Sequence, residues 1–203
     1  MRLFDGGRAP NPRRVRIFLA EKGLEIPFVP VDMSAMEHRG EAITRRNPLQ
    51  RLPVLELDDG TVITESVAIC RYFEEMTPEP PLFGSGPVGR ALVEMWQRRV
   101  EFGLHGPVAA AFRHLHPAMK GWEKPQVPEW GEVNKPKAVA FMRFLDGELA
   151  ERPHVSGDDF TIADITAFVA VQFMKPARIE MPADLAHLRR WYDAVAARPS
   201  AEA

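Results

Sequence analysis

The stretch that decides the fold reads Asn47-Pro48-Leu49-Gln50-Arg51-Leu52-Pro53-Val54-Leu55-Glu56-Leu57-Asp58-Asp59-Gly60-Thr61-Val62-Ile63-Thr64-Glu65-Ser66. Pro53 lacks a backbone donor, so it fits the first residue of a strand and not the interior of a central one. Asp59-Gly60 permits the positive φ angles of a tight turn, which pairs residues 54–57 with residues 61–64 as an antiparallel hairpin. The stretch therefore predicts a strand begun by proline, a hairpin, and a helix that begins near Ser66.

Both ends of this stretch are suited to holding a peptide. A cis Leu52-Pro53 bond would turn the chain and leave the backbone amide and carbonyl of Leu52 to pair with an extended ligand. Helix N-termini attract carboxylates, so an N-cap at Ser66 beside Glu65 would suit a ligand with both a carboxylate and an ammonium group. A γ-glutamyl group carries both. The same residues also fit an ordinary hairpin followed by a capped helix.

The flanking residues complete a small unit of strands and helices in the order βαβαββα. Beside the hairpin, we predict strands over residues 2–5 and 27–32, and helices over residues 12–22, 37–46 and 66–76. The first helix has an apolar face and ends at Gly23, a residue type that favours the left-handed conformation after a helix. The last helix carries Ile69, Tyr72, Phe73 and Met76 at helical spacing.

A second, all-helical domain is predicted after a linker. Residues 77–87 are rich in proline and glycine, which excludes regular structure. The helical segments that follow are predicted over residues 88–116, 133–151, 161–174 and 185–197. Thr161 and Asp164 form a capping box, and the helix that they begin is apolar nearly all round, which places it at the centre of its domain. The expected domains are residues 1–76 and 88–203, joined by residues 77–87.

Composition narrows the classes of partner. The 203 residues are enough for two small domains, and 26 Lys plus Arg against 28 Asp plus Glu give a net charge of −2. That balance offers no footprint for nucleic acid or for an anionic membrane. The chain has one cysteine, Cys70, no signal-peptide pattern and no apolar run that would span a bilayer, so we expect a cytoplasmic protein.

Taken from end to end, the chain resembles the glutathione transferase family over nearly all of its length. The residues that carry the resemblance are Asn11-Pro12-Arg13-Arg14-Val15-Arg16-Ile17-Phe18-Leu19-Ala20-Glu21-Lys22-Gly23, Leu52-Pro53, Glu65-Ser66 and Thr161-Ile162-Ala163-Asp164. The first segment is most similar to the bacterial and fungal branch called Gtt2-like, which lacks the usual catalytic tyrosine, serine or cysteine. The resemblance implies an α+β protein with a thioredoxin-like N-terminal domain, an all-α C-terminal domain, a homodimer, and reduced glutathione as co-substrate.

The chemistry is expected in the loop of residues 6–12. A free thiol has a pKa of about 8.5, and a helix N-terminus, nearby cations or donated hydrogen bonds favour its thiolate. Serine-bearing relatives carry their hydroxyl where this chain has Ala9, so the usual donor is absent. The resemblance makes Asn11 the best replacement, because some bacterial branches of the family place an asparagine amide against the sulfur. Asn11-Pro12 also suits an N-cap and N1 pair with no other role. The two roles are compatible, since the side-chain oxygen can cap the helix while the NH2 points at the sulfur.

By position, the resemblance also assigns the rest of the glutathione site. Gln50 and Arg51 are expected to hold the glycyl carboxylate, Leu52 and Pro53 to form the backbone clamp, and Glu65 and Ser66 to hold the γ-glutamyl end. The charged residues nearby, His38, Arg39, Arg8 and Arg13, are expected to be solvated, and Cys70 to be a buried and inert thiol.

The second substrate, a small hydrophobic electrophile, is expected between the domains. Its predicted contacts are Pro10, Leu104, His105, Val108 and Phe112, with His105 as a candidate acid–base group acting through water. His114 and His116 have the wrong spacing for two ligands on one helical face, so we expect no metal.

The sequence therefore predicts a glutathione transferase and leaves two alternatives open. The same thiolate would also reduce peroxides or glutathionyl mixed disulfides, and Ala9 keeps open a non-catalytic protein-interaction module built on the same fold. Nothing in the sequence names the electrophile.

Overall fold

The computed structural model describes residues 1–203, and these residues form two compact units. The first unit consists of Met1–Pro81 together with Pro199–Ala203, and the second of Leu82–Arg198. The division between the units falls inside the predicted linker, and the last five residues return to the first unit.

The first unit is built on a four-stranded sheet with the order β2-β1-β3-β4. Strand β1 (Arg2–Asp5) runs parallel to β2 (Phe28–Pro30) and antiparallel to β3 (Val54–Glu56), which forms a hairpin with β4 (Val62–Thr64). The predicted hairpin is confirmed, and Gly60 has the positive φ, +86°, that its turn requires.

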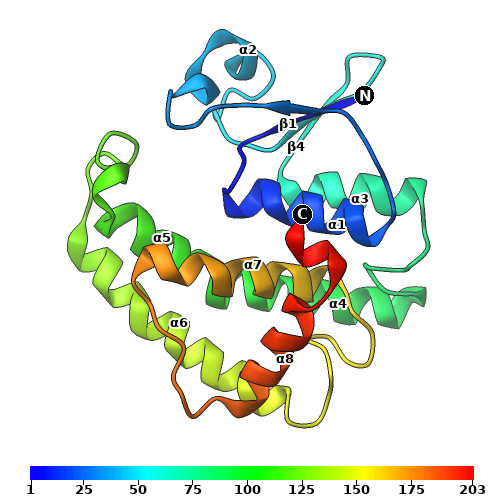
Figure 1. Ribbon diagram of the computed structural model, residues 1–203, viewed down its shortest axis with the longest axis vertical. Helices are drawn as coiled ribbons and strands as arrows, with labels where there is room; N and C mark the ends of the chain where they lie inside the picture. Colours follow the sequence, from blue (N-terminus) through cyan, green and yellow to red (C-terminus); the bar gives the residue numbers. More distant parts are fainter. The chain divides into compact units, whose positions relative to one another are not determined.

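Alternation along the strands supplies the sheet with two apolar faces. In the register of β1 and β3, Leu3 lies opposite Leu55 and Phe4 opposite Val54, and successive residues of a strand point to opposite faces. On one face, Phe4, Val31, Ile43, Leu52 and Val54 form a buried cluster. Figure 1 shows helices α1 (Pro10–Glu21) and α3 (Ser66–Met76) side by side on the opposite side of the sheet from α2 (Glu41–Thr44).

The helices of this unit follow the prediction with three corrections. Helix α1 begins at Pro10 instead of Pro12, while its predicted end is confirmed: Gly23 has φ +63° and the amide of Leu24 bonds back to the carbonyl of Leu19 at 2.9 Å. The predicted helix over 37–46 is a 3-10 turn (Glu37–Arg39) and the short α2, because Gly40 between them is extended. Met76 is 60% exposed, so its predicted place on the buried face of α3 is wrong.

The C-terminal residues close the first unit. A 3-10 turn (Pro199–Glu202) lies beside α1, as Figure 1 shows at the red end of the chain. Arg13 donates to the carbonyl of Ala201 at 2.6 Å, and the hydroxyl of Ser200 donates to the carboxylate of Glu21. Arg13 is thus a structural tie, and the expectation that it is solvated is wrong.

The second unit is all-helical, as predicted. The predicted segment 88–116 is one continuous run of α4 (Gly86–Val100), a π-helical turn (Glu101–His105) and α5 (Gly106–Leu115). A short 3-10 turn (Pro117–Met119) leads to α6 (Pro128–Glu148), α7 (Ile162–Ala177) and α8 (Ala186–Ala196). A Cβ atom at Gly103 would lie 2.1 Å from the ring of Phe141, so only glycine allows this close approach of the π-helical turn to α6.

The capping box at the start of α7 is confirmed, and it anchors the unit's core. The fully buried Asp164 accepts from the Thr161 amide at 3.0 Å, from the Val155 amide at 2.8 Å and from the indole Nε1 of Trp191 at 2.9 Å. Helix α7 is buried over most of its length, which confirms its central position. None of the helices has the combination of length and apolar character that crossing a bilayer requires.

Candidate glutathione site

The loop between β1 and α1 is held rigidly by contacts of its neighbours. Arg16 donates to the carboxylate of Asp5 at 2.8 Å and to the carbonyl of Gly7 at 2.9 Å. A Cβ atom at Gly6 would lie 2.7 Å from the sulfur of Met33, and Gly7 has φ +63°. These contacts fix the position of the start of α1 relative to the end of β1.

Asn11 lies in the first turn of α1 and does not cap it. Pro10, whose fixed φ suits the first helical position, begins the helix two residues earlier than predicted. The N-cap residue is therefore Ala9, whose side chain has no polar group to cap the helix. Pro10 and Pro12 have no N–H, and the Arg13 amide bonds to the carbonyl of Ala9 at 3.1 Å. Among residues 10–13, the backbone N–H of Asn11 is thus the one donor that makes no hydrogen bond within the helix.

A buried arginine joins Asn11 to the start of α3. Arg14 is 1% exposed, and its Nη1 donates to Oδ1 of Asn11 at 3.3 Å and to Oγ of Ser66 at 2.7 Å. Asn11 and Ser66 are thereby brought to one place from two different helices. The sequence analysis missed Arg14, although its position four residues before the buried Phe18 puts both on one helical face.

The start of α3 differs from the prediction in a similar way. Ser66 is the first residue of α3 and the preceding Glu65 occupies the N-cap position with φ +67°, so the predicted N-cap at Ser66 is wrong. A residue other than glycine in this region of φ stores on the order of 1–3 kcal/mol of strain, and such residues cluster at ligand sites. The side chain of Glu65 is exposed and that of Ser66 is buried.

The segment before β3 is shaped by a second buried polar residue, Asn47. Its Nδ2 donates to the carbonyl of Arg51 at 2.9 Å, and its Oδ1 accepts from the amide of Leu49 at 3.1 Å. Gln50 has φ +55° and its side chain donates to the hydroxyl of Thr44 at 3.2 Å. The sequence analysis did not single out Asn47, although asparagine commonly bonds to the backbone two residues on in turns.

The Leu52-Pro53 bond is cis, as the sequence analysis considered. The side chain of Leu52 is in the buried cluster, and its backbone N–H and carbonyl make no hydrogen bond to another backbone group. Both backbone groups therefore remain for a ligand.

Comparisons with known proteins agree with this geometry. Residues 9–76 match the sequence model described as "Glutathione S-transferase, N-terminal domain", and residues 128–194 match the one described as "Glutathione S-transferase, C-terminal domain". Glutathione S-transferase 2 of Saccharomyces cerevisiae is 36% identical over 203 residues, which cover 98% of this chain and 87% of that protein. The chain belongs to the glutathione S-transferase family.

Solved structures place it in the Gtt2-like branch. The crystal structure of Gtt2 from Saccharomyces cerevisiae has a TM-score of 0.94 and 36% identity, covering 100% of this chain and 99% of that one. A class Gtt2 structure from Vibrio parahaemolyticus has a TM-score of 0.86 and 35% identity, covering 98% and 95%. A glutathione S-transferase domain-containing protein of Marinobacter aquaeolei VT8 has a TM-score of 0.92 and 43% identity, covering 98% and 99%. The predicted family, branch and fold class are confirmed, and the chain is a glutathione transferase enzyme.

The burial of His38 and Cys70 tests two further predictions. His38 is 3% exposed, so the expectation that it is solvated is wrong; burial, followed by the charges of Arg39 and Arg51, lowers its pKa. Cys70 is fully buried, as predicted, and burial raises the pKa of its thiol, which disfavours the reactive thiolate.

The residues predicted for the second substrate fall into two groups. Leu104 and Val108 are fully buried core residues of the helical unit, whereas Pro10, His105 and Phe112 keep some exposed surface. The ring of Phe112 lies 4.8 Å from that of Phe173 on α7. We therefore retain only the partly exposed residues as candidates for contact with an electrophile.

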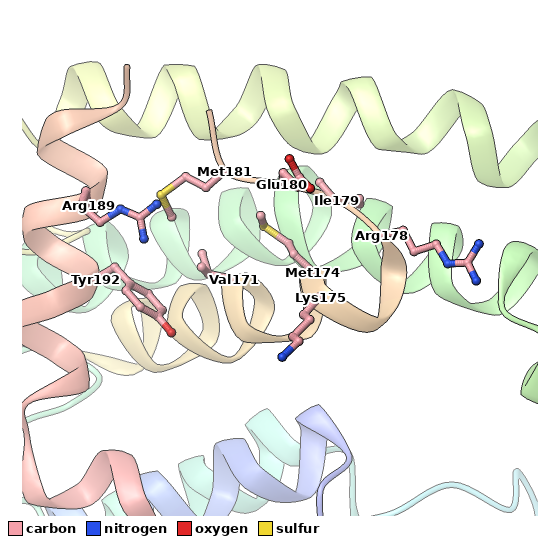
Figure 2. A pocket seen from close by; sticks show the side chains of 9 residues that line it. All are labelled: Val171, Met174, Lys175, Arg178, Ile179, Glu180, Met181, Arg189 and Tyr192. Carbon is pink, nitrogen blue, oxygen red and sulfur yellow. The ribbon is translucent and has the colours of Figure 1, made fainter. Parts of the chain in front are cut away.

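The transferase also has a pocket that the sequence analysis did not anticipate. It lies in the helical unit, has a volume of about 670 Å³, and is lined by Val171, Met174, Lys175, Arg178, Ile179, Glu180, Met181, Arg189 and Tyr192. Figure 2 shows Arg189 near Met181, and the side chains of Lys175 and Arg178 extending from the end of α7. Three cations against one carboxylate, around an apolar floor, give the pocket a positive rim.

Proposed function

We propose that this transferase binds reduced glutathione along the first unit with the cysteinyl sulfur at the N-terminus of α1, where Asn11 stabilises the thiolate. The other proposed contacts follow the peptide from its γ-glutamyl end to its glycyl end: Glu65 and Ser66, then the backbone of Leu52 before Pro53, then Gln50 and Arg51. The thiolate attacks an electrophilic carbon of a small hydrophobic substrate, and the leaving group departs with the bonding electron pair.

The observation that supports this proposal is the shared guanidinium nitrogen of Arg14. It lies 3.3 Å from Asn11 Oδ1 and 2.7 Å from Ser66 Oγ, so the residues proposed for the sulfur and for the γ-glutamyl group are neighbours in space. Lowering the thiol pKa by about two units takes about 2.7 kcal/mol of preferential stabilisation. Hydrogen bonds to charged groups contribute about 1.5–3 kcal/mol each, so the backbone N–H and side-chain NH2 of Asn11 are sufficient.

An ultraviolet difference titration of bound glutathione from about pH 5 to pH 9 tests the proposal. Thiolate absorbance that appears well below the free pKa of about 8.5 supports activation of the thiol. No binding, or no shift of the thiol pKa, contradicts it and favours the interaction module. Product analysis then separates thiol transfer, which gives a thioether, from the peroxidase or disulfide reductase alternative, which gives oxidised glutathione.

Replacing Asn11 by aspartate is expected to lower kcat/KM about 10- to 100-fold while leaving stability nearly unchanged. The variant removes the NH2 donor and adds an anion, a loss of roughly 1.4–2.7 kcal/mol in stabilisation of the thiolate. Stability is maintained because an acidic residue is favourable in the first turn of a helix. Asn11→Ala is the matched control, since it removes the donor without adding charge and should lose less activity. Unchanged turnover of Asn11→Asp would remove Asn11 from the mechanism.

The cellular location, the oligomeric state and the electrophile contacts are proposed from membership of the family. We propose a cytoplasmic homodimer, with Pro10, His105 and Phe112 as contacts of the electrophile. No group of three or more His, Cys, Asp or Glu side chains is arranged to hold a metal ion.

The pocket of the helical unit favours a second function, the binding of amphipathic organic anions. Its volume of about 670 Å³ suits a small molecule, and Lys175, Arg178 and Arg189 on its rim form no ion pair within the chain. An aromatic body would contact the apolar floor, which includes the buried Met174 and Ile179, while its acid group meets the cations.

Reversing one charge at this pocket should therefore weaken the binding of an anionic probe. We expect Arg189→Glu to weaken the binding of 8-anilinonaphthalene-1-sulfonate about tenfold, or about 1.4 kcal/mol, in a fluorescence titration. Arg90→Glu on α4 makes the same change of charge away from the pocket and should leave the affinity unchanged. Equal weakening by both variants would show a general charge effect instead of a site.

A further inference from the structure

The contacts of Arg14 restrict which atoms of its two partners face the ligand. A guanidinium group has only donors, so Oδ1 of Asn11 and Oγ of Ser66 must both act as acceptors toward Nη1. We infer that Arg14 is a positioning residue that turns both partners into donors toward glutathione. This inference rests on the proposed function and assigns Arg14 a part in it.

For Asn11 the consequence concerns the two ends of its amide. The oxygen and the NH2 group lie in one plane and diverge from the amide carbon, so they face different neighbours. With the oxygen fixed on Arg14 at 3.3 Å, the NH2 group is turned away from Arg14 and is available to the sulfur. In the opposite orientation the amide oxygen would face the thiolate and repel it, because both are acceptors.

For Ser66, the contact with Arg14 determines where the hydroxyl hydrogen can be donated. The hydroxyl can donate one hydrogen bond and accept two, and Arg14 occupies an acceptor position at 2.7 Å. The hydroxyl hydrogen is therefore left to donate to the carboxylate of a γ-glutamyl group. Arg14 thus acts on the sulfur through Asn11 and on the peptide's far end through Ser66.

The burial of Arg14 makes this arrangement rigid. The side chain is 1% exposed and lies among the packed residues of α1 and α3, so solvent does not compete for its hydrogen bonds. A rigid donor within the protein fixes the orientation of both partners before the ligand arrives, which lowers the entropic cost of binding.

The test is a thiol titration and a glutathione binding measurement on Arg14→Met and Arg14→Lys. We expect Arg14→Met to raise the pKa of the bound thiol by about one unit and to weaken glutathione binding about tenfold. Arg14→Lys keeps the charge but lacks the planar fork of donors, so it should recover only part of each effect. If Arg14→Lys restores both quantities completely, charge alone explains them and the orienting role is wrong.

A neighbouring arginine provides the control for simple loss of stability. Arg13→Met removes the hydrogen bond to the carbonyl of Ala201 in the same unit, so it should lower stability without changing the thiol pKa. If Arg14→Met does not fold, Arg14→Lys and Ser66→Ala still decide the matter. Ser66→Ala should weaken glutathione binding and leave the thiol pKa unchanged, and a raised pKa in this variant would contradict the separate routes.

The unmodified enzyme distinguishes the two proposals. An unshifted thiol in its titration would overturn the proposed function, and the inference with it. A shifted thiol that is unaffected by Arg14→Met would leave the proposed function standing and overturn the inference alone.

Discussion

Replacing Lys22 by methionine is expected to lower the free energy of unfolding by about 3–5 kcal/mol, because it removes one member of a buried ion pair. The Lys22 side chain is fully buried, and its Nζ lies 2.6 Å from Oε2 of Glu74. It also donates to the carbonyls of Thr77 at 2.8 Å, Pro78 at 3.2 Å and Pro80. One ammonium group therefore holds α3 and the start of the connection to the helical unit against α1.

Urea unfolding followed by circular dichroism measures this loss. The double variant Lys22→Met/Glu74→Leu should be more stable than Lys22→Met alone, because it removes the buried charge as well as its partner. Lys120→Met, at an exposed position, is the matched control and should change the free energy of unfolding by less than about 0.5 kcal/mol. A loss below about 1 kcal/mol in Lys22→Met would show that the buried ammonium contributes little.

Replacing Asp164 by alanine is expected to cost at least about 3–5 kcal/mol in the helical unit. The variant leaves the amides of Val155 and Thr161 and the indole Nε1 of Trp191 without their acceptor in the interior. Each unsatisfied buried donor costs about 1–3 kcal/mol, and the lost capping box adds to the total.

Asparagine at this position separates the hydrogen bonds from the packing. Asp164→Asn keeps the size of the side chain but offers one acceptor oxygen in place of two, so its stability should lie between those of the wild type and Asp164→Ala. Trp191 fluorescence during thermal unfolding reports directly on this contact, since the indole lies 2.9 Å from the carboxylate. Equal stability of the alanine and asparagine variants would contradict the importance of the remaining acceptor.

Local chemistry made several parts of the fold predictable from the sequence. The Asp59-Gly60 turn, the helix end at Gly23, and the capping box of Thr161 and Asp164 all depend on residues within a few positions of one another. The broken helix at residues 37–46 was harder to predict, because elements of three and four residues give the apolar period too few repeats to distinguish α from 3-10 structure.

The candidate site shows where such reasoning fails. Asn11 and Ser66 were recognised as candidates, but both were assigned N-cap roles that belong to Ala9 and Glu65. Their actual partner, Arg14, is 52 positions away from Ser66 in the sequence. Propensities describe neighbours along the chain, and a buried arginine that bridges two helices leaves no local signal except its place on an apolar face. The family and branch, by contrast, followed from motifs spread over the whole chain.

The return of Pro199–Ala203 to the first unit determines the order in which this protein can be completed during synthesis. The ribosome releases the sheet and α1 early, but Ala201 and Ser200, which bond to Arg13 and Glu21, are made only after the helical unit. A nascent thioredoxin-like unit must therefore wait, with one flank of α1 uncovered, until the whole helical unit has been translated. Its contacts with residues 199–203 form only after those residues have been translated.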